Sequence, residues 1–235
     1  MDTSMSFNTR NRVDTIYNIS RVTYVSKYKK YLFNRVFDVL FSLGAILLFM
    51  PIMLIVALLI KINSPQGTIL FKQKRLGLDG KLFYVYKFRT MVVDAEKKLE
   101  QLLSEDSLLK QEYLTFRKLK KDPRIIPNIG NFLRKSSLDE LPQFFNVLLG
   151  DMSIVGPRPY IENEFQVYPT KLELKIVTAV KPGVTGYWQV IPERHETTFL
   201  HRVRTDIEYI EKKSFKLDLE IIAKTVGVMA LRKGA

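Results

Sequence analysis

The sequence predicts an α+β fold that is mainly helical, with a small β-hairpin, a re-entrant N-terminal membrane segment and amphipathic interfacial helices. The first observation is an uncharged apolar run from Val39 to Ile60, because about 20 such residues suffice for a helix to span a bilayer. The second is a pair of β-prone segments joined by a glycine-containing turn. The third is that most of the remaining chain has the apolar spacing of helices.

These observations divide the 235 residues into three parts. Residues 1–34 form a polar and basic arm, residues 35–63 a membrane segment, and residues 64–235 a cytoplasmic domain. A chain of this length can bury one substantial core. We therefore expect any functional site to lie in the third part, close to the membrane.

Pro51 stands in the middle of the apolar run. A proline there loses a backbone hydrogen bond and clashes with the preceding turn, which costs roughly 3 kcal/mol. Basic residues flank both ends of the run: Lys27, Lys29, Lys30 and Arg35 before it, and Lys61, Lys72, Lys74 and Arg75 after it. The positive-inside tendency favours cytoplasmic placement of both flanks, which a helix broken at Pro51 and returning to the same side satisfies. A kinked spanning helix is the alternative.

The charge balance predicts an anionic partner. The chain has 37 Lys and Arg against 24 Asp and Glu, a formal net charge of +13, which suits nucleic acid, anionic lipid or a phosphorylated substrate. It has no cysteine and only two histidines, which excludes disulfides and thiolate metal sites and argues against a histidine-rich one. It also lacks the glycine signatures of dinucleotide folds and P-loops, and the Asp-x-Asp of many nucleotide-sugar transferases.

The predicted hairpin follows a turn at 63–67 and pairs residues 68–75 with residues 82–90. Lys87 and Arg89 are two residues apart, so they share one face of the second strand. Two cations on one face suit a pyrophosphate or lipid headgroups. A solvated basic edge explains them equally well.

Helices are expected over residues 94–119, 160–180 and 216–231. Asp94 is a suitable N-cap for the first of them. The last is amphipathic, so it lies either against the membrane or on the core. Trp188 suits a membrane–water interface, a stacking surface or an ordinary core.

The stretch from Ser136 to Pro159 carries the residues best suited to chemistry. Asp139 and Glu140 are adjacent carboxylates at the start of a short apolar helix. A capping box beginning at Ser137 is the plain structural explanation. However, a proline at position 142 is comfortable only in a first helical turn, which moves the cap toward Asp139.

Two arginines near this carboxylate pair point to a phosphate rather than to a cap. Arg158 is flanked by prolines in Gly156–Pro159, and each ring stiffens the backbone that carries the guanidinium. Arg134 stands five residues before Asp139. Rigid cations beside a carboxylate pair are a plausible phosphate site.

Several motifs then follow in order: Lys87-Phe88-Arg89-Thr90-Met91, Ser137-Leu138-Asp139-Glu140-Leu141-Pro142-Gln143, Asn146-Val147-Leu148, Gly150-Asp151-Met152-Ser153, Val155-Gly156-Pro157-Arg158-Pro159 and Lys181-Pro182-Gly183-Val184-Thr185-Gly186. From about Arg35 to the C-terminus, the chain strongly resembles the bacterial sugar transferases, the monotopic polyprenyl-phosphate phosphoglycosyl transferases. That family carries an N-terminal re-entrant helix broken at a proline, often as Ser-Pro. Here the pair is Met50-Pro51.

The resemblance implies a membrane enzyme with a covalent mechanism. A sugar 1-phosphate would pass from a UDP-sugar to undecaprenyl phosphate with release of UMP, on the cytoplasmic face of the bacterial inner membrane, in the first membrane step of polysaccharide assembly. Asp139 would be the nucleophile, kept ionised by a helix N-terminus. Glu140 would hold Mg²⁺, and Arg158 would clamp phosphate oxygens.

Weaker candidates for the same anionic pocket are Lys87, Arg89 and Arg134. The family often has Gly-Arg after the Trp-Gln-Val segment, where this chain has Ile191-Pro192-Glu193-Arg194, so the role of Arg194 in binding substrate stays open. The insertion 97–121 and the aromatic segment 186–189 resemble members that use galactose or glucose 1-phosphate. An N-acetylated or dideoxy sugar stays open too.

Two other classes compete with this interpretation. A basic membrane-tethered binding protein would explain the charge and the apolar run, but leaves the carboxylate pair unexplained; salt-sensitive DNA binding would favour it. A metal-dependent glycosyltransferase would release UDP instead of UMP. With the phosphoglycosyl transferase interpretation we expect UDP-sugar, undecaprenyl phosphate and the lipid bilayer as partners and no nucleic acid, while homo-oligomerisation stays open.

Overall fold

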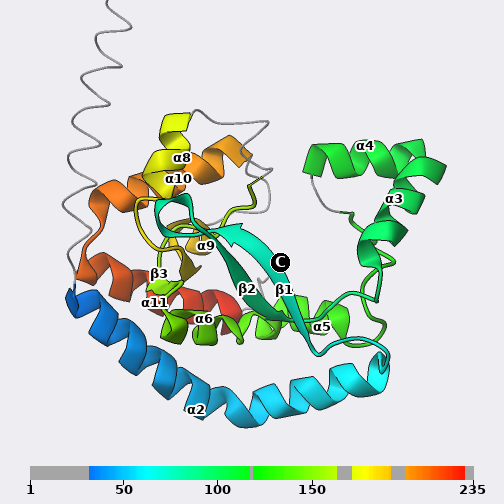
Figure 1. Ribbon diagram of the computed structural model, residues 1–235, viewed down its shortest axis with the longest axis horizontal. Helices are drawn as coiled ribbons and strands as arrows, with labels where there is room; N and C mark the ends of the chain where they lie inside the picture. The colour runs from blue at the N-terminus through cyan, green and yellow to red at the C-terminus, as the bar shows by residue number, and fades with distance from the viewer. Residues whose placement is uncertain (1–31, 117–118, 163–170, 192–198, 231–235) are drawn as a thin grey trace, which may run out of the picture.

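The computed structural model describes residues 32–116, 119–162, 171–191 and 199–230. Its longest element is α2 (Leu32–Asn63), a single helix of 32 residues that contains Pro51. Figure 1 shows α2 bending near its middle as it passes along one side of the molecule. The predicted break at Pro51 is therefore a bend within one helix, since a proline distorts the turn before it without ending the helix.

One face of α2 packs on the rest of the protein on both sides of the bend. Its buried side chains have the spacing of one helix face, mostly three, four or seven residues apart: Asp38, Ser42, Ala45, Ile46, Met53, Val56 and Ile60. The opposite face is apolar and exposed: Leu40, Leu43, Leu47, Leu48, Leu54, Ile55, Leu58 and Ile62. Residues 34–63 are long and apolar enough to cross a membrane by length and composition.

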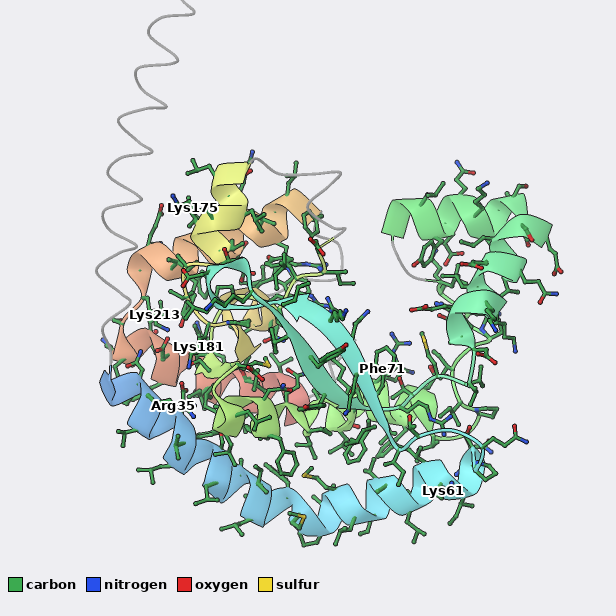
Figure 2. The ribbon with its side chains drawn as sticks, viewed as in Figure 1. Arg35, Lys61, Phe71, Lys175, Lys181 and Lys213 are labelled. Atoms are coloured by element: carbon green, nitrogen blue, oxygen red, sulfur yellow. The ribbon has the colours of Figure 1, made fainter. Side chains whose placement is uncertain are left out.

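Polar contacts fasten α2 at both of its ends, where Figure 2 shows Arg35 and Lys61. The Arg35 guanidinium donates hydrogen bonds to the carbonyls of Val147 and Leu148 in α6 (Gln143–Leu149). The Lys61 ammonium donates to the carbonyl of Pro65 at 2.6 Å. Between them, the Asp38 carboxylate accepts hydrogen bonds from the start of β3 (Ser153–Val155). These contacts attach the first limb of α2 to α6 and β3, and its far end to the following turn.

The predicted hairpin is confirmed. β1 (Leu70–Leu76) pairs antiparallel with β2 (Leu82–Phe88). A single turn, η2 (Leu78–Gly80), joins them and places Asp79 and Gly80 at positive φ, where glycine and aspartate are tolerated. The register places Arg75, Val85 and Lys87 on the same face.

The prediction of one continuous helix over residues 94–119 is wrong. The structure has α3 (Ala95–Glu105) and α4 (Ser107–Phe116), which stand apart from the rest of the molecule in Figure 1. Asp106 separates them in an extended conformation, and its carboxylate accepts hydrogen bonds from the backbone of Leu108 and Leu109. Asp106 is therefore the N-cap of a second helix, while Asp94 precedes α3 without a side-chain cap.

The core is built by short elements between α2 and two C-terminal helices. They are α5 (Gly130–Ser136), η3 (Leu138–Glu140), α6, β3, α8 (Lys171–Val177), β4 (Gly183–Thr185), α9 (Tyr187–Val190), α10 (Phe199–Lys212) and α11 (Phe215–Ala230). β3 and β4 form a short parallel pair. The helix expected over 216–231 is confirmed as α11, and within the described part of 160–180 the helix is α8.

Two hydrophobic clusters meet at the segment that carries the candidate site. One lies around β3, α8 and α10 and includes Val147; the other joins the far limb of α2 to α5 and includes Leu141. Phe144 packs against both clusters. The chain from η3 to α6 is consequently held from two sides. Trp188 is buried, with 8% exposure.

Candidate active site

Asp139 and Glu140 lie in the 3₁₀ turn η3, between α5 and α6. The turn starts after Ser137, which adopts a left-handed conformation (φ 57°) and makes no side-chain capping hydrogen bond. The capping-box explanation is therefore wrong for this segment. Leu138 and Leu141 pack into the second core cluster, which fixes the turn between the hydrophobic anchors on either side of the two carboxylates.

Burial raises the pKa of Asp139 to about 7, and the neighbouring charge of Glu140 adds to the rise. Lys87 and Arg134 act in the opposite direction and lower that pKa. A helix N-terminus was expected to keep Asp139 ionised, but Asp139 lies before the start of α6. Its loss of hydration raises its pKa by more than Lys87 and Arg134 lower it. At neutral pH its protonated and ionised forms coexist.

Lys87 reaches from β2 to η3 and forms an ion pair with Glu140, with 2.5 Å between Nζ and Oε1. Both side chains are partly exposed. The structure therefore brings the predicted residues Lys87, Asp139 and Glu140 together. Arg134, in the last turn of α5, lies close enough to lower the pKa of Asp139.

A small polar cavity opens beside this ion pair. Its lining residues are Arg75, Val85, Lys87, Glu140, Gln143, Arg158, Pro159, Gly183 and Gln189. Arg158 comes from the loop after β3, and its Nε is buried without a hydrogen-bond partner among the described residues. Three cations and one carboxylate give this small cavity, of about 10 Å³, a positively charged lining.

A buried carboxylate holds the loop that presents Arg158. Asp206 of α10 accepts hydrogen bonds from the backbone N–H of Arg158 at 3.1 Å and from the Tyr160 hydroxyl at 2.6 Å. Burial raises the pKa of Asp206 to about 6. The guanidinium of Arg158 lies 5.8 Å from the ring centroid of Trp188, and that of Arg202 lies over the same ring at 4.2 Å.

A larger apolar cavity of about 550 Å³ also borders η3, at Glu140. The first limb of α2 and the helix α11 supply most of its wall, including Leu40, Gly44, Ile222 and Val226, and α6 adds Phe144. Glu140 and Gln189 line both this cavity and the polar one. Glu140 therefore stands where an apolar and a cationic compartment meet, whereas Asp139 lines neither cavity.

The structure corrects the placement of Arg89. This side chain is buried at the turn that follows α2, where its Nη2 donates to the carbonyl of Ser64 at 2.6 Å. It packs so closely on Gly67 that a Cβ there would overlap the guanidinium. Arg89 lines neither cavity, because its side chain is held at the turn that follows α2. Arg194 lies outside the described residues.

Sequence reasoning missed Arg75, Gln143 and Gln189 as lining residues. Arg75 was counted only as a charge flanking the membrane segment. Strand alternation and a correct register, which place Arg75 and Lys87 on one face, could have found it. Gln143 and Gln189 carry no comparable signal, because their approach depends on packing between distant segments.

The carboxylate pair has a donor set that fits Mg²⁺ only in the presence of a phosphate. Among the described residues no group of three or more His, Asp or Glu side chains forms a ready-made metal site. Mg²⁺ is usually held by one or two carboxylates together with substrate phosphates and water. Asp139 and Glu140 could provide the protein share, although Lys87 already pairs with Glu140.

Comparison with known proteins identifies the family of this chain. The family model described as bacterial sugar transferase matches residues 29–232. The chain is 39% identical over 211 residues to a UDP-galactose-lipid carrier transferase of Erwinia amylovora, covering 90% of this chain and 43% of the relative. It is 38% identical over 202 residues to the exopolysaccharide production protein ExoY of Sinorhizobium fredii, covering 86% and 87%.

A third relative is the UDP-glucose:undecaprenyl-phosphate glucose-1-phosphate transferase of Escherichia coli, which is 40% identical over 209 residues. That match covers 87% of this chain and 41% of the relative. The chain thus spans less than half the length of the Erwinia and Escherichia proteins and most of the length of ExoY. The family match covers most of the chain, and the protein belongs to the bacterial sugar transferase family.

Proposed function

We propose that this protein transfers a sugar 1-phosphate from a UDP-sugar to undecaprenyl phosphate and releases UMP. The names of the relatives support galactose 1-phosphate or glucose 1-phosphate as the group transferred. The name of the ExoY relative supports a role in exopolysaccharide production.

One observation carries the proposal: Glu140 lines both the cationic and the apolar cavity. A reaction between a nucleotide diphosphate and a lipid phosphate needs a polar and an apolar binding region that meet at one reacting group. The polar cavity offers Arg75, Lys87 and Arg158 to an anion. The apolar cavity offers a wall of α2, α6 and α11 to an isoprenoid chain.

In the first step, an oxygen of the ionised Asp139 carboxylate attacks the β-phosphorus of the UDP-sugar. A carboxylate–phosphorus bond forms, the bridging bond to the α-phosphate breaks, and UMP leaves with that electron pair. Lys87 and Arg158 stabilise the phosphate charge that develops. In the second step, an oxygen of undecaprenyl phosphate attacks the same phosphorus and Asp139 leaves as a free carboxylate.

Mg²⁺ held by Glu140 and substrate oxygens would supply further neutralisation of the phosphate charge when bound. Lys87 would have a second role before the substrate binds. Its ammonium pairs with the Glu140 carboxylate and lowers the pKa of Asp139, which favours the ionised form of Asp139. Chelation of divalent cations is accordingly expected to stop UMP release.

The packing of α2 supports a re-entrant arrangement on the cytoplasmic side. Its buried face contacts the protein body both before and after Pro51, whereas a spanning helix would carry its far limb away from that body. Arg35 and Lys61 place positive charge at the two ends, as expected for two cytoplasmic flanks. The exposed apolar face would then lie in one leaflet.

The reaction is tested with detergent-solubilised protein, Mg²⁺, undecaprenyl phosphate and a panel of UDP-sugars, scored for UMP against UDP. UMP release with one sugar is the expected result and names the substrate. UDP release would indicate direct glycosyl transfer and contradict the roles given to Asp139 and Glu140. Neither product with any sugar, from a folded sample that binds anionic lipid, would favour a non-catalytic binding protein.

A further inference from the structure

The loop that carries Arg158 runs from Gly156 to Tyr160 and is attached to β4 and β1 through its carbonyl groups. These are the carbonyls of Pro157, Pro159 and Tyr160, which accept hydrogen bonds from the Gly183 N–H, the Arg75 guanidinium and the Leu76 N–H. Between Gly156 and Tyr160 the Arg158 N–H is the only backbone donor, because proline has none. Whatever accepts from this N–H therefore acts directly on the backbone of Arg158.

The acceptor is the carboxylate of Asp206 in α10. Its Oδ2 accepts hydrogen bonds from the Arg158 N–H at 3.1 Å and from the Tyr160 hydroxyl at 2.6 Å. Asp206 is 1% exposed and lines neither cavity. Removing its side chain would leave both donors without this acceptor, which typically costs more than a hydrogen bond contributes to stability. Asp206 thus holds the loop from within the core.

The helix α10 also meets the guanidinium of Arg158, through Trp188. Arg202 stands one helical turn before Asp206, and its guanidinium lies 4.2 Å from the ring centroid of Trp188. The Arg158 guanidinium lies 5.8 Å from the same centroid, within the range of a cation–π contact. Trp188 is the only tryptophan in the chain, so its fluorescence reports where the Arg158 side chain lies.

We propose that Asp206 is a positioning residue, which fixes the backbone of Arg158 so that its guanidinium stays beside Trp188 and Glu140. This inference rests on the proposed function, in which Arg158 stabilises the charge that develops on the phosphate during transfer. Arg158 and Glu140 line the same cavity, and a displacement of about 1 Å can slow an enzymatic reaction roughly 100-fold. A carboxylate suits this role because it accepts stronger hydrogen bonds than a neutral group does. Asp206 lines neither cavity, so its effect on the reaction passes through Arg158.

The placement of Arg158 is tested first, without the reaction, by the fluorescence lifetime of Trp188 in the full chain in detergent. Arg158→Ala is expected to change this lifetime, because it removes a guanidinium from the surroundings of the ring. In an Asp206→Ala background the same substitution should change it much less, since the guanidinium has already moved away. An equal change in both backgrounds, or none in either, would overturn the proposal, whether or not the protein is active.

The consequence for the reaction is tested by a double-mutant cycle on UMP release without lipid acceptor, at saturating UDP-sugar. Asp206→Ala should lower the rate at least about 10-fold, with a smaller change in the UDP-sugar concentration that gives half the maximal rate. In an Arg158→Ala background the further loss should stay within about twofold, because Asp206 then has no guanidinium to place. Asp206→Asn keeps an acceptor oxygen and should recover most of the loss. An equal loss in both backgrounds would show that Asp206 supports the fold alone.

Asp218→Ala is the matched control. Asp218 in α11 is also a buried carboxylate that accepts from a tyrosine hydroxyl, but its partners are Tyr209 and Lys213 rather than the Arg158 loop. Arg158→Ala should have its full effect on the lifetime and on the rate in this background. An effect reduced as much as in Asp206→Ala would attribute the coupling to lost stability and overturn the assignment. If Asp206→Ala loses its fold by thermal unfolding, Asp206→Ser replaces it, because the shorter side chain ends before the position of Oδ2.

The outcome is separable from that of the proposed reaction. UMP release by the wild type, with equal effects of Asp206→Ala in both backgrounds, rejects only the role of Asp206. A coupled change in Trp188 fluorescence, in a protein that never releases UMP from UDP-sugars, rejects only the reaction.

Discussion

At the scale of single residues, Asp139 combines a proposed nucleophilic role with surroundings that disfavour its charge. Its pKa is raised to about 7 by burial and by Glu140, while Lys87 and Arg134 act against the rise. The unfolded chain would lose the same proton near pH 3.8. Between these values the folded state binds the proton more tightly, so the partly buried carboxylate of Asp139 reduces stability as pH rises.

Asp139→Asn should therefore abolish UMP release and raise the melting temperature. The amide cannot attack phosphorus, and it removes a carboxylate whose ionisation opposes folding above about pH 4. Each kcal/mol gained corresponds to roughly 2–4 °C in a protein of this size. Thermal unfolding in detergent at pH 4, 6 and 8 checks this, with the difference expected to vanish at pH 4 and to be largest at pH 8. Normal activity, or a lower melting temperature at pH 8, would contradict the environment assigned to Asp139.

The raised pKa of Asp139 also predicts how the rate of the first half-reaction depends on pH. UMP release without lipid acceptor should rise with pH through a midpoint near 7, because only the ionised carboxylate attacks. Omitting the acceptor matters, since a phosphate monoester itself titrates near pH 6. Lys87→Gln should move the midpoint to higher pH because Lys87 lowers the pKa of Asp139. Lys74→Gln, on the outer face of the hairpin, should leave it in place.

At the scale of secondary-structure elements, the sequence correctly predicted the features that depend only on residues close together in the chain. The hairpin followed from alternation and a turn with Asp79 and Gly80. The division at Asp106 was missed because a polar residue within a helical pattern has two local explanations, a solvated helix position and an N-cap. Arg89 was misplaced because strand alternation gives the face of a side chain but not what packs against it. Arg75 was overlooked because its register with Lys87 was not considered.

The placement of α2 is an element-scale prediction that this chain makes easy to test. It contains no cysteine, so Asn34→Cys and Asn63→Cys each introduce a single thiol, one at each end of the helix. Both should react with a membrane-impermeant maleimide in inside-out vesicles and neither in intact spheroplasts, because both limbs pack on one body. Labelling of the two positions from opposite sides would establish a spanning helix instead.

At the scale of the whole molecule, the candidate site depends on segments far apart in the sequence. The apolar cavity exists only because α2, α6 and α11 come together, and the polar one because β1 and β2 meet the loop carrying Arg158. Sequence patterns identified Asp139, Glu140 and Arg158 as candidates, but neither cavity could be predicted, since each arises from long-range packing. The arrangement implies that the two half-reactions can be impaired separately.

Gly44→Leu tests that separation. Gly44 lines the apolar cavity, and a Cβ built there meets nothing within 4 Å, so a leucine side chain can occupy the space proposed for the isoprenoid. UMP release without acceptor should stay within about twofold of the wild type, while KM for undecaprenyl phosphate should rise about 10-fold or more, as expected for a loss of roughly 1.4 kcal/mol in binding.

Gly227→Leu is the control for that variant, because Gly227 is also a helical glycine with open space at its Cβ but does not line the cavity. Both replacements remove a helical glycine and should favour the helix by a similar amount. A difference between them therefore reports occupation of the cavity rather than a change in helix stability. An unchanged KM for undecaprenyl phosphate in Gly44→Leu would place the lipid chain elsewhere, and equal losses of both half-reactions would show that the two cavities do not act separately.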